Sequence, residues 1–245
     1  MSTAIAPASI AQAKRAAVRP QRLSTLLTVE LRKLIDTRSG KAVLGIGVAI
    51  PLAALTWLLI KGSGGDGSWR FFSQFTPVLG LIIPLIGLFA MTSEWTQRTA
   101  LTTFTLSPRR GRVLAMKFVA ALMLSMVVLA AVIGLTIGAT ALDGLISGQS
   151  PSYEFLGADV RGLIIMTALQ VTMAAGFGAL AAQTAIAVGA FMVAPTLWTA
   201  IGPLVFGTNA DWLDVFTAYA RLSSDAPLTD LPQTLTAIAV WVVLP

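Results

Sequence analysis

Long apolar runs separated by short polar segments dominate the chain, and each run is close in length to a membrane-crossing helix. Such a helix needs about 20 apolar residues to cross about 30 Å of hydrocarbon. The first uncharged run, 42–60, has 19 residues, the second, 71–93, has 23, and the third, 118–142, has 25. We therefore predict an all-α protein that crosses a membrane several times.

The longest uncharged stretch must hold two crossings. It covers the 49 residues 162–210, about 74 Å as one helix at 1.5 Å per residue. We divide it near Gln183 and Thr184, and so short a turn predicts an antiparallel helix pair. The last run, Leu231–Pro245, has only 15 residues, so we expect an incomplete sixth span. The predicted spans are 42–60, 71–93, 112–142, 162–182, 185–206 and 232–245.

Two features of the runs indicate how the spans pack. Pro77 and Pro84 each remove a backbone hydrogen bond, which membrane helices tolerate where neighbours satisfy the freed carbonyl. We expect the second span to be kinked and packed against protein. The segment 174–182 is rich in alanine and glycine, which favours close approach between helices.

The chain before the first span falls into two parts. Residues 1–21 lack apolar periodicity, and we predict a disordered tail. Residues 22–40 have leucines at helical spacing and predict an amphipathic helix in the plane of the membrane interface. Its charged side chains, assigned to the polar face, include Glu30, Arg32 and Lys33. The helix is either a simple anchor or an anchor that also contacts a partner, and membrane lipid is expected beside it in both cases.

The distribution of charge predicts the orientation. The chain has 17 basic and 11 acidic residues, and eight of the basic ones precede the first span while five lie in 91–117. The loops 143–159 and 207–232 are poor in lysine and arginine, which is typical of the outer side. The N-terminus is therefore predicted to be cytoplasmic, with Lys61 and Arg70 as the exception in the first outer loop. No nucleic acid is expected as a partner, because the basic residues are concentrated before the first span and in one loop and do not cover one face.

The outer loop 207–232 has its own apolar pattern. Trp212, Val215, Phe216 and Tyr219 recur at helical spacing, and aromatic side chains favour the membrane interface. We predict a short helix on the outer surface.

Missing residue types exclude most catalytic chemistry. The chain has no histidine and no cysteine, so the usual general base, thiolate metal ligands and disulfides are absent. No phosphate-binding loop occurs, because Gly40-Lys41 is followed by alanine. We expect neither an enzyme nor a cofactor site in this chain.

The polar segment between the second and third spans has the most specific pattern. It reads EWTQRTALTTFTLSPRRGRVLAMK from Glu94 to Lys117 and follows an amphipathic helix and two spans. This order resembles the permease subunit of ABC-2 type (type V) ATP-binding-cassette exporters, over most of the chain from about Leu23 onward. The resemblance implies a six-helix transmembrane domain with an N-terminal interface helix, in the cytoplasmic membrane, and we expect a bacterial protein.

The same resemblance implies a coupling segment at 94–110 that docks on a separate ATPase. The residues implied in that contact are Glu94, Arg98, Thr99, Leu101, Phe104, Arg109 and Arg110. It also implies two ATPase subunits, which would bind ATP and magnesium, and a second permease, identical or closely related. For Arg109, Arg110 and Arg112, positive-inside orientation is an equally good explanation, and these residues with Lys117 are expected at the membrane boundary.

The span interiors hold no ionisable residue, which favours a hydrophobic or amphipathic cargo over ion-coupled transport. Polar or polarisable side chains within the spans are candidates for a pathway, although helix packing explains each of them as well. They are Gln74, Thr76, Gln170, Thr172, Met173, Phe191, Met192 and Trp198. A membrane anchor or immunity protein that binds a partner without transport is the alternative function.

Overall fold

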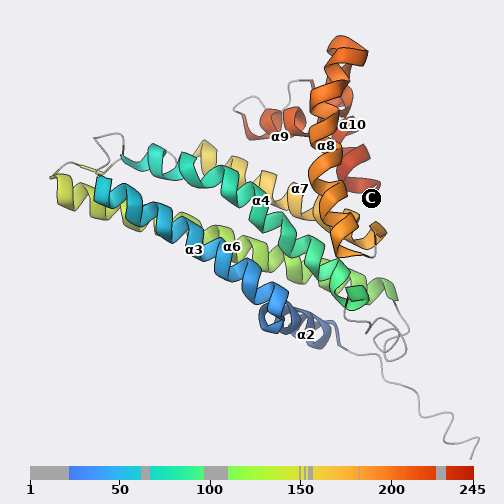
Figure 1. Cartoon of the computed structure of the whole chain (residues 1–245), viewed down its shortest axis with the longest axis horizontal. Coiled ribbons are helices and arrows are strands. Elements are labelled where there is room, and N and C mark those ends of the chain that lie inside the picture. The colour runs from blue at the N-terminus through green and yellow to red at the C-terminus, as the bar shows by residue number, and fades with distance from the viewer. Residues whose placement is uncertain are drawn as a thin grey trace, which may run out of the picture.

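The computed structural model describes residues 22–61, 67–96, 110–148, 150–151, 153, 157–181, 183–224 and 230–245, and this part of the chain contains helices and no strand. The predicted tail, 1–21, lies outside it. The α-helices are α2 (Leu23–Asp36), α3 (Arg38–Lys61), α4 (Gly67–Thr96), α6 (Arg110–Ser147), α7 (Ala158–Ala181), α8 (Thr184–Phe206), α9 (Val215–Ser223) and α10 (Leu231–Ile238) (Figure 1). The 3-10 helix η2 (Gly207–Leu213) precedes α9, and the π-helix η3 (Ala239–Val243) continues α10.

The described helices have the length and composition of membrane spans. Four apolar segments are long enough to cross a membrane, namely 40–57, 111–147, 159–181 and 184–213. Two shorter apolar segments are 79–95, which lies within the 30-residue α4, and 231–243. Each predicted span falls on one of these helices. The protein is thus all-α and membrane-like, although α6, with 38 residues and a length of about 57 Å, is longer than a bilayer requires.

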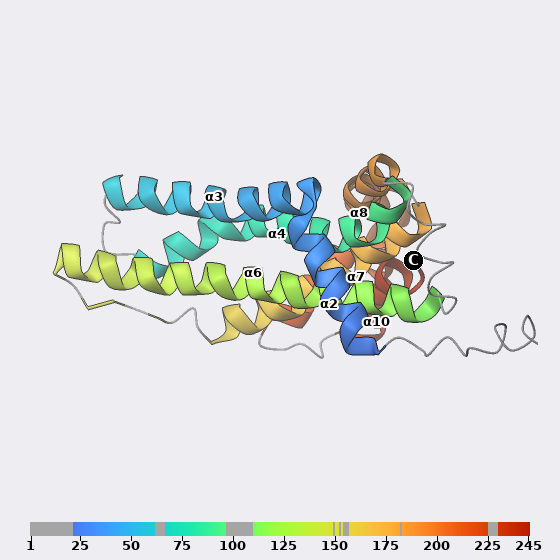
Figure 2. The same ribbon diagram turned by 90° about the horizontal axis from the view of Figure 1, so that it is seen from below.

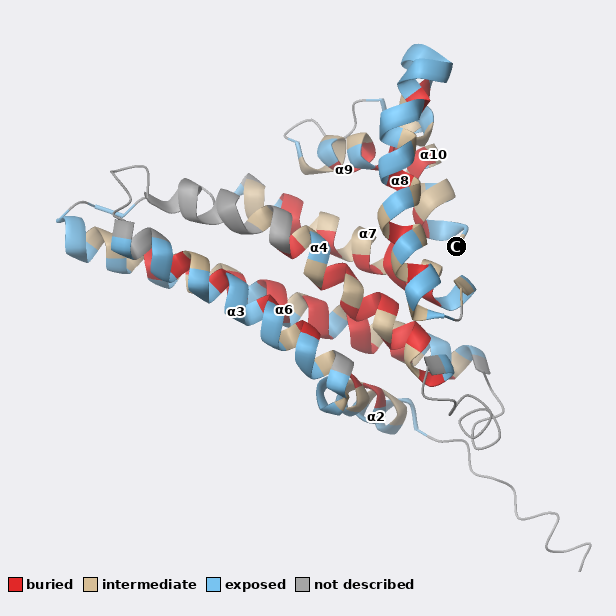
Figure 3. Cartoon of the chain, in the orientation of Figure 1, coloured by how far each residue is buried: buried red, intermediate tan, exposed pale blue. Residues whose placement is uncertain are grey.

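Helices α3, α4, α6 and α7 lie side by side and alternate in direction (Figures 1 and 2). α4 is the central helix, because it packs against α3, α6, α7 and the start of α8. It runs unbroken through Pro77 and Pro84, and its residues Ile83 and Leu88 are almost completely buried. The prediction that this span packs against protein is confirmed. Figure 3 shows the buried residues concentrated where α4, α6 and α7 meet.

Glycines allow α4 and α7 to approach closely, as the small residues of 174–182 predicted. A Cβ atom on Gly178 would lie 2.8 Å from the carbonyl oxygen of Leu88. A Cβ atom on Gly87 would lie 2.7 Å from the carbonyl oxygen of Val171. The backbones of these helices are therefore in contact where a larger side chain would separate them.

The amphipathic helix α2 crosses the ends of α3 and α6 (Figure 2). It ends at Asp36 because Thr37 is extended, with φ −70° and ψ 151°. The Thr37 hydroxyl accepts a hydrogen bond from the Gly40 amide at 3.2 Å, which caps the first turn of α3. A side chain on Gly40 would collide with the carbonyl oxygen of Leu34, so the sharp corner between the two helices requires glycine there.

The predicted antiparallel pair of α7 and α8 is wrong in one respect. The helices are neighbours in space, but α8 runs across α7 and away from it (Figures 1 and 2). The first half of α8 packs on α7 in a buried cluster in which Phe191 of α8 meets Met173 of α7 and Val215 of α9. The second half of α8 packs on η2 instead, where Trp198 contacts Ala210.

The C-terminal helices follow α7 along its length. Ser223 at the end of α9 lies against Gly162 near the start of α7, and Pro245 lies against Gly176 near its end. The predicted short helix is found as α9, with Trp212 in the preceding η2. Val215 and Tyr219 of α9 are buried against α7, whereas Phe216 is exposed. The helix α10 itself packs against α9 and η2 and lies beside α8, and only its continuation η3 reaches α7 (Figure 1).

Candidate functional site

Four charged side chains meet where α2 crosses the bundle. Lys33 Nζ of α2 lies 2.8 Å from Glu30 Oε1 and 3.3 Å from Glu94 Oε1 at the end of α4. Lys117 Nζ of α6 lies 2.9 Å from Glu30 Oε2 and 3.1 Å from Glu94 Oε1. We call these four residues the α2 ion cluster. Each lysine bridges both carboxylates, so the cluster joins three helices.

The α2 ion cluster is largely removed from solvent. The side chains of Lys117, Glu30 and Glu94 are 2%, 6% and 7% exposed, whereas that of Lys33 is 41% exposed. Two positive and two negative charges balance within the group. Buried ions persist only when they are paired and hydrogen-bonded, because their desolvation is costly. The three helices must therefore keep this arrangement for the charges to remain neutralised.

The position of Glu30 differs from the sequence prediction. It was assigned to the polar face of the amphipathic helix, but it is buried together with Leu34. The reason is spacing: Leu27, Glu30, Leu31 and Leu34 occupy one stripe of α2, and this stripe faces the bundle. Arg32 does lie on the exposed face, as predicted.

The protonation of Lys33 follows from these neighbours. Burial lowers the pKa of its ammonium group, but the hydrogen bond and charge of Glu30, followed by the charge and hydrogen bond of Glu94, raise it by more. The net effect raises the pKa of Lys33 above its ordinary value of 10.5. The lysine is therefore charged at neutral pH.

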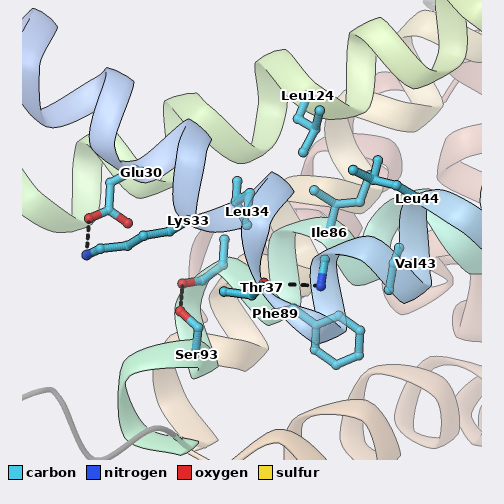
Figure 4. A pocket seen from close by; sticks show the side chains of 12 residues that line it. Glu30, Lys33, Leu34, Thr37, Val43, Leu44, Ile86, Phe89, Ser93 and Leu124 are labelled. Atoms are coloured by element: carbon cyan, nitrogen blue, oxygen red, sulfur yellow. Dashed lines mark hydrogen bonds and ion pairs between the residues drawn. The ribbon is translucent and has the colours of Figure 1, made fainter.

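A small cavity lies beneath α2, next to the α2 ion cluster (Figure 4). Its polar end is formed by Glu30, Lys33, Thr37 and Ser93, and its apolar wall includes Ile86. The volume is about 20 Å³, which is room for one or two water molecules. The cavity is too small for cargo, and it belongs to the junction between α2 and the bundle.

The predicted coupling segment is only partly within the described residues. Glu94 lies in the last turn of α4, and its carboxylate is buried against Lys33 and Lys117. The adjacent Trp95 is 49% exposed. Arg98, Thr99, Leu101, Phe104 and Arg109 lie outside the described residues. Arg110 is the first residue of α6, and its side chain is not among those described. The docking of this segment on an ATPase stays a prediction.

Lys117 is the residue of the α2 ion cluster whose contacts were not predicted from the sequence. The resemblance implies a place for Lys117 at the membrane boundary, yet it is among the most buried large side chains described. A signal was available, because Lys117 directly precedes a long uncharged run and Glu94 directly follows another. A cation and an anion at the adjacent ends of two neighbouring spans favour pairing.

The pathway candidates do not form one surface. Met173 and Phe191 are buried in the cluster of α7, α8, α9 and η3, where Met173 Sδ accepts a hydrogen bond from the Tyr219 hydroxyl at 3.5 Å. Trp198 Nε1 donates to the Ala210 carbonyl at 3.1 Å. These contacts favour the packing explanation for these three residues.

The remaining pathway candidates are more scattered. Met192 is half-buried beside the same cluster, and Thr172 donates to the Ala168 carbonyl at 2.7 Å within its own helix. Gln170 of α7 faces Gly80 of α4, and Thr76 is half-buried one turn away from that glycine. The side chain of Gln74 is not described. The fold thus groups Met173, Phe191 and Met192 in one buried cluster and places Gln170 separately beside Gly80.

Comparison of the chain with models of known protein families, with curated proteins and with solved structures found no match. The resemblance to ABC-2 permeases therefore rests on the residues quoted above. Within the described residues, no group of three or more acidic side chains could hold a metal ion.

Proposed function

We propose that this chain is the permease subunit of an ATP-binding-cassette exporter that moves a hydrophobic or amphipathic substrate with a separate ATPase. The observation that carries the proposal is the α2 ion cluster. It connects the interface helix to the end of α4 and the start of α6. The end of α4 and the start of α6 also bound the segment 94–110, which the resemblance assigns to ATPase docking.

The cluster would transmit movement between the docking region and the spans. Each lysine contacts a carboxylate on α2 and one on α4, and Lys117 itself belongs to α6. Displacement of α2, or of Glu94 at the start of the 94–110 segment, would change the packing of the spans, because separated charges would be buried without partners. Nucleotide-dependent movement of the ATPase would in this way favour one of two helix packings over the other.

The helix packing also agrees with such a role. The exposed apolar side chains of α8 include Val193, Leu197 and Leu204, so this helix is available to lipid or to a second permease. The proposed assembly has two permeases and two ATPases, with ATP and magnesium bound only by the latter.

The proposal is tested by reconstituting the chain in nanodiscs with the ATPase encoded beside it and measuring ATP hydrolysis. Phe104→Asp should weaken complex formation and permease-stimulated hydrolysis on the order of tenfold or more, as for the loss of an interface anchor. Phe216→Asp is the matched control, because Phe216 is an exposed aromatic residue on α9, away from the start of α6 (Figure 1).

The outcomes separate the candidate functions. If Phe104→Asp leaves both complex formation and hydrolysis intact, the coupling assignment is wrong. If the two proteins bind but the chain never changes hydrolysis, the non-transporting anchor is the better explanation. Glu94→Arg is a poor test, since it would disrupt the buried cluster as well as any docking contact.

A further inference from the structure

The outward face of α2 and the first turn of α3 form a basic surface beside the first span. We propose that this surface binds the head group of an anionic phospholipid. The proposal does not depend on transport, because it concerns contacts between this chain and its membrane.

The exposed charges of this region are mostly basic. Arg22, Arg32, Arg38 and Lys41 are exposed, against one exposed acidic residue, Asp36. The other acidic residue of α2, Glu30, is buried and paired with two lysines. The field outside α2 is therefore positive, which attracts anionic head groups at a membrane surface.

A hollow on this face provides the donors that a phosphodiester requires. It is open to the surrounding medium, has a volume of about 340 Å³, and is lined by Val29, Arg32, Lys33, Asp36 and Thr37. The guanidinium of Arg32 can donate two parallel hydrogen bonds to phosphate oxygens. Lys33 has three ammonium hydrogens and uses two on Glu30 and Glu94, so the third is available on its exposed side.

The position of the hollow favours a lipid over an acidic protein surface. The apolar window that begins at Gly40 follows α2 directly, and Ile46 and Ile50 of α3 are exposed beyond it. A lipid can place its phosphate on α2 and its acyl chains along these side chains. Val29 and Ile35, which are 44% and 46% exposed on α2, offer further apolar contact at the same boundary.

Energy transfer from α2 to labelled lipid tests the proposal. The chain has no cysteine, so Thr25→Cys on the exposed face of α2 gives a single labelling position for a fluorescent donor. The full chain is placed in phosphatidylcholine nanodiscs with a trace of acceptor-labelled phosphatidylglycerol or acceptor-labelled phosphatidylcholine. We expect phosphatidylglycerol to be enriched near α2 by roughly threefold or more, as the local positive charge requires.

Variants of opposite sign sharpen the test. Arg32→Gln combined with Arg38→Gln should abolish the enrichment, whereas Asp36→Asn should increase it because an acidic group leaves the hollow. Arg161→Gln, which removes a charge at the opposite end of the bundle, should leave it unchanged. Equal transfer to both lipids, or no response to the Arg32 and Asp36 variants, would overturn the proposal. Loss of ATPase binding in the double variant with unchanged lipid enrichment would assign the surface to a protein instead.

Discussion

Within the described residues, two groups of opposite charges differ in burial and in the segments that they connect. The α2 ion cluster joins residues up to 87 positions apart, and three of its four side chains are at most 7% exposed. The second group, the α9 ion cluster, consists of Arg221 with Asp211 at 3.1 Å and Asp230 at 3.6 Å. Its carboxylates are 47% and 53% exposed, and all three residues lie within one short C-terminal segment.

The difference shows that charge pairs of similar geometry have unequal roles. An exposed pair adds little, because water screens the ions and solvates either one after the other is lost. A buried pair gives little net stabilisation over an apolar replacement, but removal of one ion leaves the other without solvation. The α2 ion cluster therefore makes the arrangement of three helices all-or-none, whereas the α9 ion cluster only supports a local turn.

The largest effect is expected for Lys117→Met. Glu30 and Glu94 would then share a single lysine in a buried position, and a loss of about 3–5 kcal/mol is expected. Thermal unfolding in detergent measures this loss. Adding Glu30→Gln to Lys117→Met should restore part of it, since one carboxylate charge is removed. Unchanged unfolding of the single variant would show that the cluster does not hold the helices.

Gly178→Ala tests how much the close packing of α4 on α7 contributes to the free energy of unfolding. The added Cβ would meet the Leu88 carbonyl oxygen, so α4 and α7 would have to separate, with an expected loss of about 1–3 kcal/mol. Gly134→Ala on α6 is the matched control, because no atom lies within 4 Å of its added Cβ. If both substitutions behave alike in thermal unfolding, close packing of α4 on α7 is not important for stability.

Asp211→Asn should have a small effect, about 0–1 kcal/mol, because its carboxylate is half exposed and Arg221 keeps Asp230 as a partner. The same unfolding measurement serves here. A loss as large as that of Lys117→Met would remove the distinction between the two groups.

The smallest effect concerns Lys33 and alkaline pH. Because its pKa is raised in the folded state, the charged lysine contributes its stabilisation fully below pH 10.5 and loses it as the pH rises through the folded-state value. The difference in unfolding temperature between the wild type and Lys33→Gln should stay constant from neutral pH to about pH 10 and shrink above 10.5. A difference that shrinks already near neutral pH would contradict this assignment.

The spans could be predicted from the sequence because charged residues mark their ends so clearly. Each predicted span falls on a helix, and the largest differences in length are those of α4 and α6, which both extend beyond the predicted spans at each end. The direction of α8 could not be predicted, because its first half packs on α7 and its second half packs on η2, and a single sequence does not show these contacts. A short turn restricts how far apart two helices begin, but not the angle between them.

The candidate site was predicted in part. The sequence pattern points to Glu30, Lys33 and Glu94 as functional residues, but it predicts that they face outward. The reason for Glu30 and Lys33 is that a charged residue in an amphipathic helix is ordinarily solvated. The inward position of Glu30 follows from its place between Leu27 and Leu34 on the buried stripe. Its partners come from two other helices, and a single sequence does not show which of its lysines lies near.

The spacing of the α2 ion cluster along the chain also sets an order of assembly during synthesis. Glu30 is made 87 residues before Lys117, and chains are inserted from the N-terminus as they emerge. Until α6 has been made, Lys33 is the only lysine of the cluster that can neutralise Glu30 and Glu94. The full set of contacts that holds α2 can form only after α3, α4 and the first turns of α6 have been made.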